Sequence, residues 1–192
     1  YIESSLDADQ DGAESLKEEY ISKAEKSVHE IEQILGTGDN IDMIKWNGLL
    51  ELARGNKDAA IRQLYSAYEG YKASDQPDSL VAYRLSEIFK DRPEIGLQKE
   101  FLEYSITPKN NMVSYRPTIL LDYADVLYDL RSWANGLKIA HYYEDSFGIS
   151  DRSTKVKARG YIGAGMIDEA KELLATLNQD EFDTLQLTYR LY

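Results

Sequence analysis

Cysteine is absent from this sequence of 192 residues. Disulfides, thiolate zinc sites and cysteine nucleophiles are therefore excluded from it. The absence does not indicate a compartment, because a cysteine-free chain is stable in either redox environment. Long apolar runs are absent too, and none approaches the ~18 residues that a membrane-spanning helix needs. We therefore expect no direct insertion into a membrane.

Basic residues are in short supply. The chain has 22 Lys and Arg against 34 Asp and Glu, which gives a formal net charge of −12. The imbalance is concentrated at the start, where residues 1–40 hold eleven acidic residues and three lysines. An acidic chain of this kind repels nucleic acid and anionic lipid. A nucleic-acid partner is therefore not expected.

Proline is scarce, and the alternating pattern of β-strands is nearly absent. Apolar residues instead recur at helical spacing, as at Leu120, Tyr123, Leu127 and Leu130, so the sequence predicts an all-α fold. The two histidines lie in no catalytic motif, and we expect no enzymatic activity. Glycines at 160, 163 and 165 resemble a phosphate loop only superficially, and we interpret them as a turn at a helix end.

Short turns and longer polar joints alternate along the chain. They predict helical hairpins at 41–74, 78–107, 115–148 and 151–178, a partial one at 1–36, and a further helix at 181–192. Small residues recur within the hairpins, twelve apart across a turn, in the pairs Gly48 and Ala60, Ala124 and Gly136, and Ala158 and Ala170. With Ala24 and Gly96 at the corresponding places, the second members repeat at steps of 36, 36, 40 and 34 residues, which is typical of helical repeat proteins.

On these segments the chain resembles the tetratricopeptide repeat family, most closely at GMIDEAKELL, residues 165–174. The resemblance implies a single domain over 1–192, an α-solenoid whose antiparallel hairpins stack into a right-handed superhelix. Asn47, Glu51 and Lys157 depart from the family by standing where it usually has apolar residues. Another hairpin solenoid or an irregular helical bundle is the alternative. Because the chain starts at Tyr1, we expect it to be part of a longer protein.

An acidic segment near the start matches the calcium loop of an EF-hand. Asp7, Asp9, Asp11 and Glu18 occupy the ligand positions and a glycine follows the third aspartate. Calcium is thus the one cofactor that the sequence suggests. Glu14 stands where an EF-hand normally has an apolar residue, and the alternative is a solvated acidic loop before a helix.

A basic cluster, Arg152, Lys155 and Arg159, has the spacing of one helix face. The family resemblance implies that this face looks into a concave groove, where such cations hold carboxylates of a partner. It also implies that Leu121, Asp125 and Tyr128 line the preceding section of that groove. The alternative is that the three cations are solvated or paired with carboxylates of the chain itself.

These observations predict a non-catalytic scaffold that binds a peptide or a partner protein in its groove. Two alternatives stay open, a calcium-binding structural segment at residues 7–18 and a substrate-positioning arm of a larger enzyme. Self-association is a further expectation, because repeats at the cut ends of a stack expose the surfaces that would cover their neighbours.

Overall fold

The computed structural model describes residues 14–36, 40–76, 78–107, 112–178 and 182–190. Helices and the turns between them account for these residues, and no strand occurs among them, as the sequence predicts. The prediction of an all-α fold is therefore confirmed. No helix in the described part of the chain is long and apolar enough to cross a membrane.

Two compact units divide the chain, residues 1–88 and 89–192, where the sequence predicts one domain. Unit 1 holds α2 (Glu14–Leu35), α3 (Ile41–Ala53), α4 (Lys57–Ala73) and most of α5 (Ser79–Phe89). Unit 2 holds α6 (Ile95–Ile106), α7 (Met112–Tyr115), α8 (Ile119–Asp129), α9 (Trp133–Phe147), α10 (Asp151–Ala164), α11 (Ile167–Leu174) and α12 (Phe182–Tyr189). The boundary falls within the predicted hairpin 78–107, at the C-terminal end of α5.

The helix bounds follow the predicted segments closely, with one difference before α8. The sequence predicts that a hairpin begins at 115, but α8 begins at Ile119, and α7 forms one short turn before it. Pro117 explains the interruption. A proline ring restricts the preceding residue and cannot donate a helical hydrogen bond, so the helix restarts after it.

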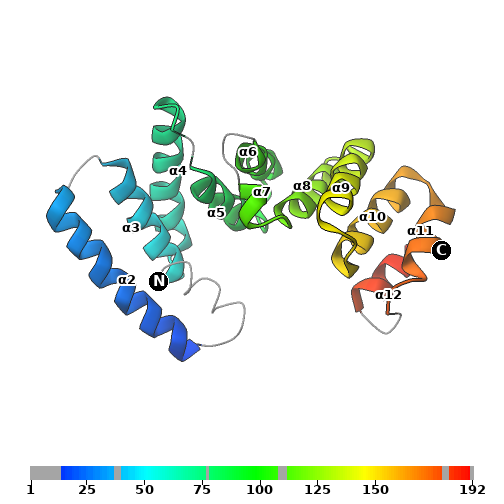
Figure 1. Cartoon of the computed structure of the whole chain (residues 1–192), viewed down its shortest axis with the longest axis horizontal. Helices are drawn as coiled ribbons and strands as arrows, with labels where there is room; N and C mark the ends of the chain where they lie inside the picture. Colours follow the sequence, from blue (N-terminus) through cyan, green and yellow to red (C-terminus); the bar gives the residue numbers. More distant parts are fainter. Residues whose placement is uncertain (1–13, 37–39, 77, 108–111, 179–181, 191–192) are drawn as a thin grey trace. The chain divides into compact units, whose positions relative to one another are not determined.

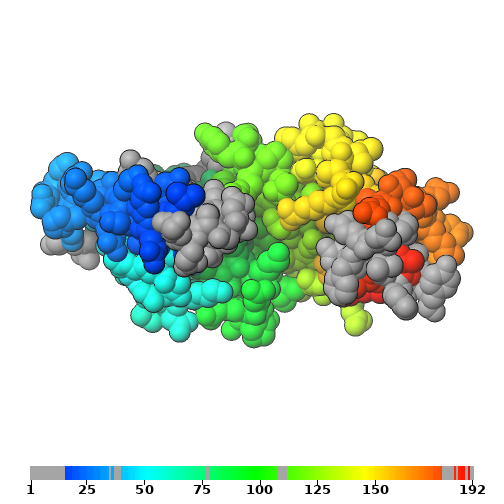
Figure 2. Space-filling model, turned by 90° about the horizontal axis from the view of Figure 1, so that it is seen from below, coloured from blue at the N-terminus to red at the C-terminus, as the bar shows by residue number. Residues whose placement is uncertain are grey.

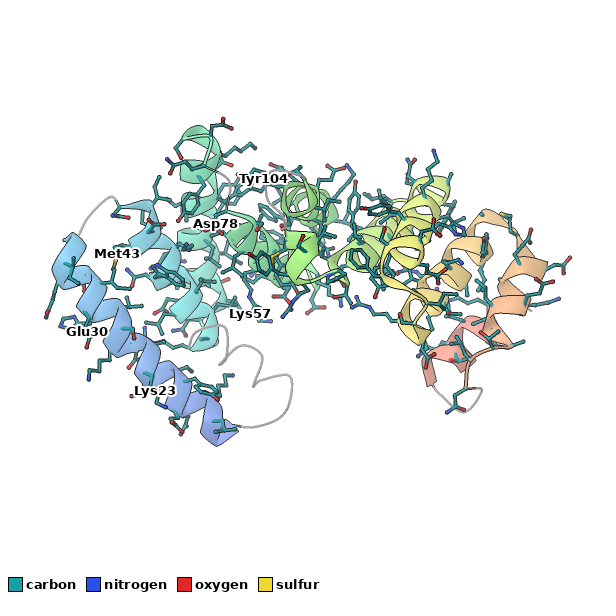
Figure 3. The ribbon with its side chains drawn as sticks, in the orientation of Figure 1. Lys23, Glu30, Met43, Lys57, Asp78 and Tyr104 are labelled. Atoms are coloured by element: carbon teal, nitrogen blue, oxygen red, sulfur yellow. The ribbon has the colours of Figure 1, made fainter. Side chains whose placement is uncertain are left out.

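In unit 1, α3 packs on both α2 and α4, as the left side of Figure 1 shows. Ala24 and Val28 are buried on α2, and Met43, labelled in Figure 3, is buried on α3. Asp78 fixes the start of α5, because its carboxylate accepts from the Val81 N–H at 3.1 Å and from the Lys45 ammonium at 3.0 Å. A polar contact thus joins α3 to the beginning of α5.

In unit 2, α9 packs on both α8 and α10, and α10 packs on α11. Figure 2 shows α9 (yellow) adjoining α10 and α11 (orange) on the surface. Contacts also join every second helix, from α6 to α8, α8 to α10 and α10 to α12. The core between α8, α9 and α10 is built around Leu121, Tyr128, Ala140 and Val156, all of them buried.

Three of the short turns have the same backbone hydrogen bonds. Gly55, Arg131 and Gly165 each adopt a left-handed conformation, with φ of 83°, 57° and 76°. Each N–H donates to the carbonyl three residues earlier, and the next N–H donates to the carbonyl five residues earlier, at 2.7 to 3.1 Å. This is the Schellman ending of a helix, which favours glycine. Arginine in this conformation costs about 1 kcal/mol relative to glycine.

Candidate binding surface and pocket

The predicted basic cluster lies on α10, where Arg152 and Arg159 form ion pairs with carboxylates of α8. The Arg152 guanidinium lies 2.6 Å from the Asp122 carboxylate on α8. The Arg159 guanidinium lies 2.7 Å from the Asp125 carboxylate and also pairs with Asp129. We call these five residues the Asp–Arg ladder. It joins α8 to α10, and it shows that the alternative of internal pairing holds for Arg152 and Arg159.

Electrostatics within the ladder reflect partial burial. Burial raises the pKa of the Asp125 carboxyl above its usual range, although the Arg159 guanidinium acts in the opposite direction. Burial opposes the charge of Arg159, but Asp125 and Asp129 outweigh it and raise the pKa of the guanidinium. Lys155 is half-buried on the same helix. With three carboxylates and two guanidinium groups, the ladder has a formal charge of −1.

Two of the residues expected in the groove lie in the core instead. Leu121 and Tyr128 are 0% and 1% exposed. Their spacing on α8 places them on the side that packs against α9 and α10, so they offer no side-chain surface to a partner. Of the three groove residues expected on α8, Asp125 alone is partly exposed, as part of the ladder.

A pocket of about 550 Å³ lies beside the ladder in unit 2, and we call it the arginine pocket. Its charged lining residues are Asp129 at the end of α8, Arg131 in the following turn, Arg159 on α10, and Arg190 directly after α12. Trp133, Ile162 and Leu187 contribute apolar walls. Sequence reasoning missed this pocket, because its residues come from three separate stretches of the chain, 128–133, 159–163 and 187–190.

Tyr128 and Trp133 form a stacked pair at the pocket, with ring centroids 5.8 Å apart and planes 24° apart. The pair rests on glycines. A β-carbon added to Gly160 would lie 2.4 Å from the Tyr128 hydroxyl, and one added to Gly163 would lie 2.3 Å from the Trp133 ring. The three glycines that the sequence analysis placed in one turn therefore have different roles. Gly165 ends the helix, whereas Gly160 and Gly163 lie inside α10 and make room for the aromatic pair.

The Tyr128 hydroxyl is buried and has no hydrogen-bond partner among the described residues. Burial, reinforced by the nearby Asp125 charge, raises the pKa of this phenol above its usual range. A buried hydroxyl without a partner costs roughly 1–3 kcal/mol. We therefore expect Tyr128→Phe to raise the free energy of unfolding by about 1 kcal/mol. Urea titration should show a higher midpoint at an unchanged slope. A lower midpoint would mean that the hydroxyl is satisfied in solution.

The acidic loop lies largely outside the described residues, which exclude Asp7, Asp9 and Asp11. Glu18, its last member, lies exposed on α2. Among the residues that the structure describes, no group of three or more His, Cys, Asp or Glu side chains could hold a metal ion. The calcium site thus stays a prediction from the sequence.

Comparison with protein-family models, curated proteins and solved structures finds no match to this chain. The resemblance to the tetratricopeptide repeat family therefore stays a prediction from the residues quoted above.

Proposed function

We propose that this chain is a non-catalytic scaffold of helical hairpins that holds a partner protein or peptide on the face carrying the Asp–Arg ladder. The observation that carries the proposal is the packing of α8 on α10 and of α10 on α12. Helices that pack on their next-but-one neighbours form a continuous row, and such rows in repeat proteins provide extended binding surfaces. The row presents a surface without any rearrangement of the core.

The charge pattern supports a recognition role for this face. Asp129 and Arg152 are exposed, and the other three ladder residues are half-buried, so both signs of charge meet solvent. Alternating charges on a surface discriminate between partners more than they add affinity. The affinity of a partner for this face should therefore depend on the order of the charges along it, and not on their sum.

A charge swap tests the proposal without breaking the ladder. The double variant Asp122→Arg with Arg152→Asp keeps an opposite-charge pair but reverses its direction on the surface. Both residues lie in the first turn of a helix, so the exchange also leaves the sum of the helix-dipole interactions nearly unchanged. Arg159→Glu would be a poorer probe, because it would place a third carboxylate beside Asp125 and Asp129.

Peptides selected from a displayed random library on the wild-type chain provide the readout. We expect some of them to bind the wild-type chain and to bind the swapped variant about tenfold more weakly, while the two proteins melt at the same temperature. The proposal fails if repeated selection yields no peptide that binds, or if every selected peptide binds both proteins equally.

A further inference from the structure

Arg131 occupies a left-handed position at which the two other short turns carry glycine, and the end of α4 carries Asp75 at such a position. The three turns share one hydrogen-bond pattern, and Gly55 and Gly165 stand at the corresponding left-handed positions. Glycine adopts this conformation without the steric penalty that a β-carbon brings. The fold therefore gains nothing from arginine at 131 through its backbone. Its side chain lines the arginine pocket, which indicates that Arg131 has its role there.

The charges of the pocket are unbalanced. It has three arginines and one aspartate, in a chain whose net charge is −12. Asp129 pairs with Arg159, which is also held by Asp125. Arg131 and Arg190 have no ion-pair partner among the described residues. Two guanidinium groups that line one pocket repel each other, and an anion between them would remove that repulsion. Arginine also binds carboxylates and phosphates through two parallel hydrogen bonds.

The size and walls of the pocket restrict the kind of anion. Its volume of about 550 Å³ lies within the usual range for small-molecule sites. Trp133, Ile162 and Leu187 provide apolar contact beside the guanidinium groups. We propose that the arginine pocket binds a small organic anion, with a carboxylate or phosphate held by Arg131 and Arg190 and an apolar body against Trp133, Ile162 and Leu187. This activity goes beyond the docking of a partner protein, because it requires none.

Three naphthyl compounds and one simple anion test which features of a ligand the pocket recognises. The naphthyl compounds are 1-naphthoate, 1-naphthyl phosphate and the neutral 1-naphthamide, and the simple anion is inorganic phosphate. Titration calorimetry would measure affinity, and the indole N–H resonance of Trp133 would report the place, with Trp46 in unit 1 as the internal reference. We expect at least one naphthyl anion to shift the Trp133 resonance and to bind about tenfold or more tightly than both naphthamide and inorganic phosphate. The order of the two naphthyl anions then identifies whether the pocket prefers carboxylate or phosphate.

Variants separate binding from folding. Arg190→Gln should weaken the preferred naphthyl anion by about tenfold. Arg62→Gln is the matched control, since Arg62 is an exposed arginine of α4, in the other unit, and should leave the affinity unchanged. Arg131→Gly is the sharpest variant. It should weaken binding by about tenfold and raise the melting temperature by roughly 2–4 °C, because glycine relieves the left-handed turn.

Several results would overturn the proposal. Equal affinity for naphthoate, naphthyl phosphate and naphthamide would remove the role of the charge. Binding of inorganic phosphate as tight as that of the naphthyl anions would remove the role of the apolar walls. An Arg131→Gly protein that keeps full affinity would remove Arg131 from the site. The proposal is also wrong if none of the small anions binds at millimolar concentration. Binding of an acidic peptide in that case would assign the pocket to partner docking.

Discussion

Replacing Gly160 with valine is expected to lower the free energy of unfolding by about 3 kcal/mol. Gly160 lies in the middle of α10, and a β-carbon there would come within 2.5 Å of the Tyr128 ring carbon that bears the hydroxyl and within 2.8 Å of a Leu137 methyl group. Tyr128 cannot move away easily, because its other neighbours include the stacked Trp133 ring and the backbone at Gly136. Thermal unfolding followed by circular dichroism should show a melting temperature lower by roughly 6–12 °C.

Gly96→Val provides the matched control for this substitution. Gly96 is also a helical glycine of unit 2, but nothing lies within 4 Å of a β-carbon added there. Since valine is at least as good a helix former as glycine, we expect a change of less than about 0.5 kcal/mol. A second comparison uses Tyr128→Leu, which empties the space above Gly160. In that background Gly160→Val should cost much less than it does alone. Equal costs at 96 and 160 would show that the close contact does not limit stability.

The sequence predicted the helical segments well because local signals determine them. Glycine and asparagine mark the turn at 54–56, and the change from apolar periodicity to polar joints marks the others. One of the predicted pairs of small residues does mark a close approach of two helix backbones. A β-carbon on Gly136 would come 3.0 Å from the Ala124 carbonyl oxygen. The stacking of hairpins into a right-handed superhelix stays a prediction.

The site was harder to predict because it depends on contacts between distant segments. The spacing of Arg152 and Arg159 correctly placed them on one face of α10, but spacing on one helix cannot reveal the carboxylates opposite. The arginine pocket had one local signal that passed unnoticed. Aligned by their turns, the segments around Gly55 and Gly165 carry glycine at the left-handed position, and Arg131 breaks the pattern. A residue that is unfavourable for its backbone is a reasonable marker of function.

Lys157 lies in a nearly buried position of α10 that accommodates its charge. The sequence places a lysine where the tetratricopeptide repeat family usually has an apolar residue. In the structure its ammonium lies 2.6 Å from the Glu144 carboxylate of α9, and the two side chains are only 12% and 9% exposed. The Ser153 hydroxyl donates to the other Glu144 oxygen at 2.8 Å, and Ser153 also forms the capping box of α10 with Ser150. An ion pair thus replaces apolar packing between consecutive helices.

Glu144→Ala should therefore lower the free energy of unfolding by about 3 kcal/mol, because it leaves the Lys157 ammonium nearly buried without a counter-charge. Urea titration should show this loss, and moderate salt should change it little, since salt screens buried charges weakly. The contrasting variant is Glu144→Leu with Lys157→Met. If the pair only fills space that apolar side chains could fill, this double variant should unfold within about 1 kcal/mol of the wild type, as replaced buried ion pairs often do. A double variant as unstable as Glu144→Ala would instead show that the bond from Ser153 to Glu144 anchors the start of α10. The two outcomes separate a lysine tolerated in the core from a polar network that sets where one hairpin ends and the next begins.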